Sequence, residues 1–223
     1  MKKLVLLFAV TVLTSVMSFA QIKEGYISYN IEVSSDEEGM EMAAIMFDGS
    51  TLDLYFGDNK ARTDMAMGPM MTMITILDEN SGDILLLMGG MLGNKAVKTT
   101  LEEMNIEEEE EPEIEIELTK DKKEIAGYKC KKAIIKNADG TEVVYWYTED
   151  IKTASTDDKA AISKLPGQAL EYSMNNNGLV MVFTATKINT SLSKEDKATI
   201  FSMEIPEDYE EITYEEFSSM GGM

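Results

Sequence analysis

Residues 52–67 read Leu-Asp-Leu-Tyr-Phe-Gly-Asp-Asn-Lys-Ala-Arg-Thr-Asp-Met-Ala-Met, and their pattern indicates the fold class of the chain. Apolar and polar side chains alternate from Leu52 to Phe56, and a period of two is typical of a strand with one buried face. Gly57-Asp58-Asn59 has the residue types of a tight turn. The chain then returns as a second strand at Ala61–Met67. Residues 51–67 therefore predict a β-hairpin.

Similar stretches follow one another along the chain and predict about ten strands with little helix, which indicates a sandwich or a barrel-like sheet. The further expected strands are residues 27–33, 70–77, 84–88, 95–100, 114–118, 130–136, 142–148, 170–174 and 179–188. A short helix or covering loop is expected at residues 36–47. A second short helix is expected at residues 157–164, with Ser155 or Thr156 as its N-cap and Pro166-Gly167 at its end.

Several of these strands are apolar on both faces. Tyr145 and Tyr147 alternate with Trp146, and Met71 and Met73 alternate with residues that are also apolar. A strand of this kind must be covered on both sides, or must present one apolar side to a cavity.

The N-terminus has the order of a secretory signal peptide. Lys2 and Lys3 precede the apolar run Leu4–Leu13, and Ser18-Phe19-Ala20 places small residues before a cut ahead of Gln21. The expected organisation is a signal peptide at residues 1–20 and one β-rich domain at residues 21–223, with residues 217–223 as a frayed tail. We expect export to the periplasm of a Gram-negative envelope, or secretion, and no transmembrane segment after cleavage.

Composition excludes several functions. The 223 residues include 20 Lys and Arg, 41 Asp and Glu, one Cys and no His, with a net charge of −21. Without His there is no Ser-His-Asp triad and no His-ligated metal, and one Cys forms no internal disulfide. The acidity argues against a nucleic-acid partner. With no nucleophile–base pair to be read, we expect no enzymatic activity and no cofactor.

A family resemblance rests on three segments and the first hairpin. The segments are Ile125–Ala133 with Val144–Ile151, Leu170–Met174 with Phe183–Ala185, and Ile205–Ile212 with Glu215–Phe217, beside Tyr55–Arg62. Together they resemble the exported bacterial family named domain of unknown function 4412, which is similar in fold class to the periplasmic lipoprotein carriers. The resemblance implies a mainly β fold: a single antiparallel, strongly curved, half-open barrel-like sheet with a few short covering helices. The carriers hold acyl chains in their concavity.

The candidate site is an apolar lining rich in methionine, a flexible side chain that suits surfaces accepting varied apolar ligands. The leading hypothesis is therefore a non-enzymatic protein that binds or carries a lipid or other apolar small molecule. The lining is predicted from face and composition to comprise Leu54, Phe56, Met65, Met67, Met71, Met73, Tyr145, Trp146, Tyr147, Met181 and Phe183. A patch left exposed by an open barrel is also a candidate contact for another envelope protein.

Two alternatives stay open, and two smaller features have plainer interpretations. Met65, Met67, Met71 and Met73 are candidate ligands for Cu(I), because thioethers are soft ligands. The second alternative is a structural envelope protein with a filled core and no ligand. Cys130 lies between two lysines that would favour its thiolate, but we interpret it as a strand residue. The Asp78–Asp83 turn resembles a loose cation loop without the EF-hand spacing, and we interpret it as a solvated acidic turn.

Overall fold

The computed structural model describes residues 22–35, 41–91, 93–104, 114–138, 140–151, 161–176 and 178–219. The strands are β1 (Gly25–Ser34), β2 (Ser50–Gly57), β3 (Lys60–Met67), β4 (Met71–Asp78), β5 (Asp83–Gly90), β6 (Lys95–Thr100), β7 (Glu115–Ile125), β8 (Tyr128–Lys136), β9 (Glu142–Thr148), β10 (Gln168–Asn176), β11 (Leu179–Asn189) and β12 (Glu210–Glu211). The helices are α1 (Glu41–Met46), α2 (Lys194–Ile200), α3 (Tyr214–Ser219) and the 3₁₀ helix η1 (Ala161–Lys164). No helix in these ranges is long and apolar enough to cross a bilayer.

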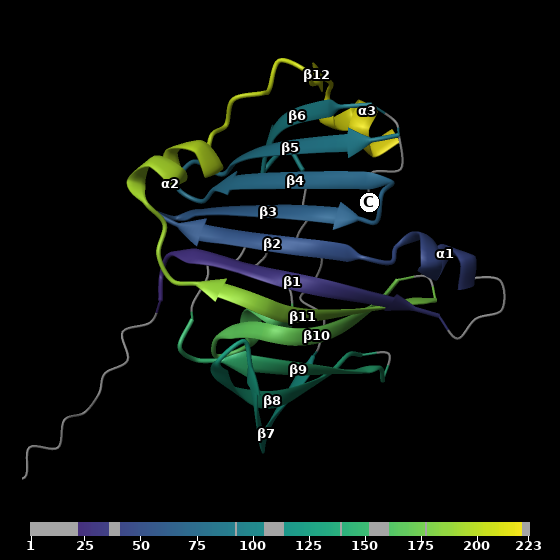
Figure 1. Ribbon diagram of the computed structural model, residues 1–223, viewed down its shortest axis with the longest axis vertical. Helices are drawn as coiled ribbons and strands as arrows, with labels where there is room; N and C mark the ends of the chain where they lie inside the picture. Colours follow the sequence, from purple (N-terminus) through teal and green to yellow (C-terminus); the bar gives the residue numbers. More distant parts are fainter. Residues whose placement is uncertain are drawn as a thin grey trace, which may run out of the picture.

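All twelve strands belong to one sheet, in the order β12-β6-β5-β4-β3-β2-β1-β11-β10-β9-β8-β7 (Figure 1). The mainly β, single-sheet architecture is thereby confirmed. The pairings are antiparallel except that of β12 with β6, which is parallel. The prediction of a purely antiparallel sheet is therefore wrong at this edge. Within the described residues β12 and β7 pair with one neighbour each, so the sheet is open.

The hairpin predicted at residues 51–67 forms as β2 and β3, with Gly57 opposite Lys60. Its two turn residues, Asp58 and Asn59, have φ angles of 55° and 57°. Positive φ at both central positions is the geometry of a type I′ turn, whose twist matches that of the flanking strands. Asp and Asn tolerate this backbone conformation better than other non-glycine residues. The turn chemistry of the sequence therefore fixes the register of this pair.

Alternation gives the centre of the sheet two different faces. Along β1, Ile27, Tyr29 and Ile31 are at most 3% exposed, whereas the residues between them face the other way. The cross-strand registers extend this division over β2 and β3. The apolar face carries the row Tyr29, Leu52 and Met65, and the polar face carries the row Ser28, Asp53 and Asp64.

Strands β4 and β5 are covered on both sides, which explains why their sequences are apolar on both faces. On the apolar face, Phe217 of α3 packs with Leu77 and Leu86. On the opposite face, the segment after α2 places Met203 and Ile205 in the cluster that contains Ile76, Leu85 and Leu87. These covering segments lie at the C-terminal end of the described chain, far in sequence from the strands they protect.

Helix α2 lies beside the β2–β3 turn (Figure 1). Ser193 is its N-cap, and the hydroxyl of Ser193 accepts a hydrogen bond from the Asp196 amide at 3.0 Å. Lys197 then joins the helix to the sheet through ion pairs with Glu24 and Asp58, each at 2.9 Å. Helix α2 is not among the helices expected from the sequence.

The expected helices and tail differ in detail from the structure. Only Ala161–Lys164 of the expected helix at 157–164 is described, and it is a 3₁₀ turn. The tail is ordered further than expected, because α3 continues to Ser219 and Phe217 is 7% exposed. Phe217, the first residue of the expected tail, instead packs on the sheet. The signal peptide at 1–20 and the proposed caps Ser155 and Thr156 lie outside the described residues.

Candidate functional site

The apolar face carries an aromatic cluster over β9, β10, β11 and β1. The ring of Tyr172 stacks on Phe183 with centroids 4.7 Å apart and on Tyr145 at 5.8 Å. Tyr29 meets Tyr172 edge-on at 6.3 Å. Its hydroxyl donates to the Ala169 carbonyl at 2.8 Å and accepts from the Gln168 amide at 3.0 Å. Burial raises the pKa of Tyr29 and of Tyr172, so both phenols stay neutral.

Methionines occupy the same face over β3, β4 and β5. Met65 lies opposite Met73, and Met73 lies opposite Met88, so three thioether side chains form one row across three strands. Met67 lies opposite Met71 in the next row of the same face. Because cross-strand neighbours have Cβ atoms about 4.5–5.5 Å apart, these side chains are within mutual contact range. We call these five residues the methionine patch.

Except for Trp146, the residues predicted to line the site lie on this one face. Phe56, Tyr145, Tyr147 and Phe183 are at most 8% exposed and belong to the packed core. The half-buried members are the ones that a ligand can touch. They are Leu54, Met65, Met67, Met71, Met73 and Met181.

Trp146 differs from the other predicted lining residues in its position on β9, although it is half-buried and packs on the central core cluster as Leu54 and Met65 do. It alternates with Tyr145 and Tyr147 along β9 and pairs with Lys132 and Glu171 on the other side of the strand. The ammonium of Lys123 lies 4.4 Å from the centre of its ring and also forms an ion pair with Glu171 at 2.6 Å. This is a cation–π arrangement outside the aromatic cluster of the apolar face.

The predicted lining omits several residues of the apolar face, among them Tyr29, Tyr172 and Met88. Tyr172 is the centre of the aromatic stack. It lies two residues from Leu170 and from Met174, and apolar residues two apart on a strand indicate one apolar face. Met88 completes the methionine row, but its alignment with Met73 depends on the β4–β5 register. The alternation signal was sufficient for Tyr172, whereas Met88 required the structure.

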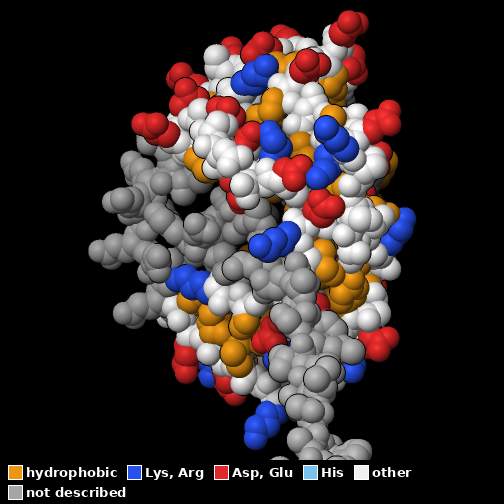
Figure 2. Space-filling view, turned by 90° about the vertical axis from the view of Figure 1, so that its left-hand side faces the viewer, with side chains coloured by type: hydrophobic (Ala, Val, Ile, Leu, Met, Phe, Trp, Pro, Cys, Tyr) orange, Lys and Arg blue, Asp and Glu red, His pale blue; other side chains and the backbone are white. Residues whose placement is uncertain are grey.

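The polar face of the central strands is shallowly hollowed and lined mainly by polar side chains. The lining comprises Ser28, Tyr29, Asn30, Glu32, Thr51, Asp53, Thr184 and Thr186. Such a face is typical of an antiparallel sheet that is solvated on one side. Figure 2, which looks onto the α2 end of the strands, shows Lys and Arg interleaved with Asp and Glu among the residues drawn in colour. The apolar face is therefore the better candidate for binding an apolar ligand.

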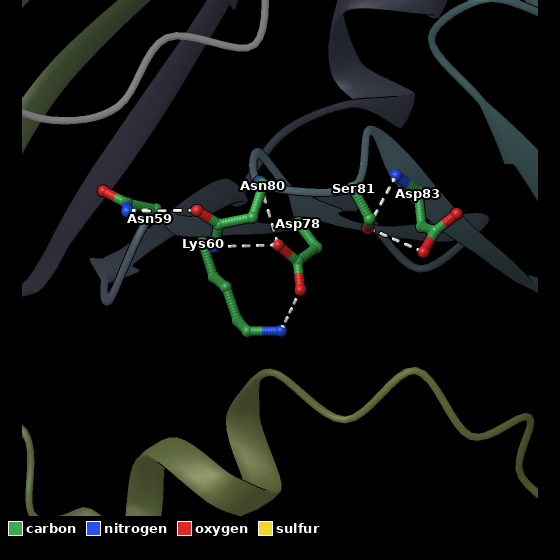
Figure 3. Close-up of polar contacts among 6 residues, drawn as sticks. All are labelled: Asn59, Lys60, Asp78, Asn80, Ser81 and Asp83. Carbon is green, nitrogen blue, oxygen red and sulfur yellow. Dashed lines mark hydrogen bonds and ion pairs between the residues drawn. The ribbon is translucent and has the colours of Figure 1, made fainter.

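In the turn between β4 and β5, the carboxylates of Asp78 and Asp83 contact neighbouring residues (Figure 3). Lys60 forms an ion pair with Asp78, and the Asn80 amide donates to the same carboxylate at 3.0 Å. Lys60 and these hydrogen bonds lower the pKa of Asp78. The second carboxylate, Asp83, accepts instead from the Ser81 hydroxyl at 2.6 Å. The two carboxylates of the turn are therefore bound by protein groups, Asp78 by Lys60 and Asn80 and Asp83 by Ser81.

Cys130 is fully buried in the main core cluster rather than exposed among lysines. Burial raises the pKa of its thiol to about 11, and the Lys123 ammonium only partly offsets this effect. Lys131 is engaged with Glu149 at 2.6 Å. The lysines next to Cys130 in sequence therefore do not produce a thiolate.

We expect Cys130 to be unreactive toward a thiol reagent at pH 8 in the folded protein and to react fully in guanidinium. Unfolding lowers its pKa toward the ordinary value of about 8.5. The stability contributed by the protonated thiol is full below that value and is lost as the pH rises through about 11. Titration with Ellman's reagent checks the first statement. Rapid labelling of the folded protein at pH 8 would contradict the burial of Cys130.

Comparisons with known proteins identify a family. The family model described as "N-glycanase peptide, N-terminal domain" matches residues 62–216. A comparison with curated protein sequences gives no significant match. The resemblance to domain of unknown function 4412 is tested by neither comparison and stays a prediction.

The similar solved structures are distant. A structure of PNGF-II in space group C2 has 14% identity and a TM-score of 0.46, covering 88% of this chain and 32% of its own. The lipoprotein LppX of Mycobacterium tuberculosis has 7% identity and a TM-score of 0.34, with coverages of 75% and 88%. A LolA superfamily protein of Nitrosomonas europaea has 7% identity and a TM-score of 0.24, with coverages of 81% and 90%.

The matches differ in how much of each protein they cover. The chain spans about a third of the length of the PNGF-II chain. The family model, in contrast, covers well over half of the present sequence and runs from β3 into α3. The chain therefore belongs to the family of N-glycanase peptide N-terminal domains.

Proposed function

We propose that this chain is an exported, non-enzymatic binding domain that holds a lipid or other apolar ligand against the apolar face of a curved, half-open sheet. The observation that supports the proposal is the run of half-buried apolar side chains across the sheet. Leu54, Met65 and Met181 pack on the central core cluster and still keep part of their surface exposed. When a ligand removes such an apolar surface from water, the free energy of binding becomes more favourable.

The two halves of this face have complementary physical properties. The aromatic cluster is stacked and anchored by the Tyr29 hydrogen bonds, so it forms a rigid floor. The methionine patch has unbranched, polarizable side chains that adapt to irregular apolar shapes. A rigid aromatic cluster beside a methionine patch with adaptable side chains suits a ligand with a flexible hydrocarbon chain. On the polar face, the hollow over the described central strands is lined mainly by hydroxyl, amide and carboxylate groups.

Native mass spectrometry of the protein purified gently from its own host tests the proposal directly. A lipid-sized adduct that is lost in organic solvent supports it and identifies the ligand class. In parallel, the purified chain is titrated with a dansyl-labelled fatty acid. A bare mass together with no saturable fluorescence change would contradict the proposal and favour a structural protein without a ligand.

Two neighbouring residues on β11 give a matched pair of variants. Met181 lies on the apolar face opposite Met174, and Val182 lies on the polar face opposite Ser173; both are half-buried. We expect Met181→Glu to weaken binding of the labelled fatty acid by about tenfold or more, because an uncompensated carboxylate would meet the hydrocarbon chain. We expect Val182→Glu to leave the affinity within about twofold of the parent. Equal losses in both variants would contradict binding at the apolar face.

A further inference from the structure

The methionine patch has a second chemistry that does not depend on apolar binding. Its five members come from three adjacent strands, and the β3–β4 and β4–β5 registers place all of them on one face. The row Met65, Met73 and Met88 crosses the strands, and the pair Met67 and Met71 lies one row further along. We propose that this patch is a thioether site for a soft monovalent metal ion, Cu(I).

The spacing of the patch suits a shared ion. Directly opposite residues have Cβ atoms about 4.5–5.5 Å apart, and residues two apart on a strand are separated by about 7 Å. A methionine side chain has three rotatable bonds, so sulfur atoms from neighbouring positions reach a common point above the sheet. The row Met65, Met73 and Met88 therefore offers three sulfur atoms from three adjacent strands to one ion.

Packing alone does not account for every member of the patch. Met65 packs on the central core cluster, whereas Met88 belongs to and Met71 packs on the cluster that includes Phe217. Met73 and Met67 lie between these clusters, and among the described residues neither is a member of a core cluster. Both are half-buried. The methionine patch therefore lies between two packed regions, and the thioether groups of Met67 and Met73 remain partly exposed for ligand binding.

The rest of the chain narrows the choice of ion. The sequence contains no His, and its single Cys is the buried, protonated Cys130. The ligands that the five described residues of the patch offer are neutral sulfur atoms, and soft thioethers select Cu(I) over Zn²⁺ and Mg²⁺. Thioethers carry no proton to displace, so binding does not weaken at acidic pH as it does for His or Cys sites. The net charge of −21 favours the approach of cations.

The test uses the full chain, anaerobically, in competition with a chromogenic Cu(I) chelator. The triple variant Met65→Leu, Met73→Leu, Met88→Leu keeps an apolar face of similar volume and removes the row of sulfurs. We expect one Cu(I) per chain in the parent, with the same affinity at pH 5 and pH 7.5, and a loss of about 100-fold or more in the triple variant. X-ray absorption is expected to show a sulfur-only ligand shell in the parent.

Exposed methionines outside the patch provide the matched control. Met42 and Met91 are 68% and 80% exposed, and we expect Met42→Leu, Met91→Leu to leave Cu(I) binding unchanged. Unchanged affinity in the triple variant, or no binding in the parent, would overturn the proposal. The Met181→Glu variant keeps all five sulfur atoms of the patch, so it is expected to lose the labelled fatty acid while still binding Cu(I). The copper site and the apolar function can therefore fail separately.

Discussion

Replacing Phe183 with alanine is expected to lower the free energy of unfolding by about 3–5 kcal/mol. Phe183 is 2% exposed, and its ring stacks on Tyr172 with an interplanar angle of 4°. Truncation leaves a cavity in the central core cluster and removes one side of the aromatic stack, and such a pair contributes about 0.5–1.5 kcal/mol beyond burial. Urea unfolding followed by tryptophan fluorescence measures the change.

The neighbouring residue supplies the control for Phe183. Val182 has its side chain on the polar face and is half-buried. We expect Val182→Ala to cost about 1 kcal/mol or less, because water replaces the lost methyl contacts. If both variants lost the same stability, the division of β11 into a core-facing and a solvent-facing side would be wrong.

A second large effect is expected at Gly25, where β1 begins beside β11. The φ angle of Gly25 is +148°, and a Cβ atom at this position would lie 2.0 Å from the Asn189 carbonyl oxygen. That atom belongs to backbone and is held by strand pairing, so it cannot move away as a flexible side chain would. We expect Gly25→Ala to cost about 3–5 kcal/mol through backbone strain and steric overlap. Urea or thermal unfolding measures this loss.

A substitution at Gly82, in the β4–β5 turn, distinguishes backbone strain from steric overlap as the cause of the effect at Gly25. Its φ angle is +76°, and nothing lies within 4 Å of the position of an added Cβ. Gly82→Ala therefore carries only the conformational cost of a left-handed residue, about 1–2 kcal/mol. A similar loss in both alanine variants would show that the close approach of Asn189 does not matter.

Local sequence signals predicted the strands because alternation and turn residues act over a few positions. The β2–β3 hairpin is the clearest case, since Asp58 and Asn59 have the conformation that their residue types suggest. Helix α2 was missed because it is seven residues long and buries none of them. Its position instead depends on contacts with distant residues, such as Glu24 and Asp58. The two-residue strand β12 likewise exists only through its pairing with β6.

The candidate site was predictable to the extent that face assignment follows from alternation. Met65, Met67, Met71 and Met73 share a face as their spacing suggested, because the short turn between β3 and β4 sets their register. Trp146 alternates with Tyr145 and Tyr147 along β9 and still packs on the central core cluster, a contact that alternation alone does not predict. Which apolar side chains are buried and which remain half-exposed depends on covering segments distant in the sequence, and no local pattern contains that information.

The position of β1 has a consequence for the order in which the chain acquires structure. β1 is the first strand to be synthesised, yet it lies inside the sheet between β2 and the late strand β11. The meander β1–β6 can form from nearby segments, and until β11 arrives β1 is an unpaired edge with a hydrophobic side. Contacts between distant segments form slowly, and such edges recruit other chains. Docking of β11 therefore removes this edge, while β4 and β5 stay uncovered until the segments after α2 pack on them.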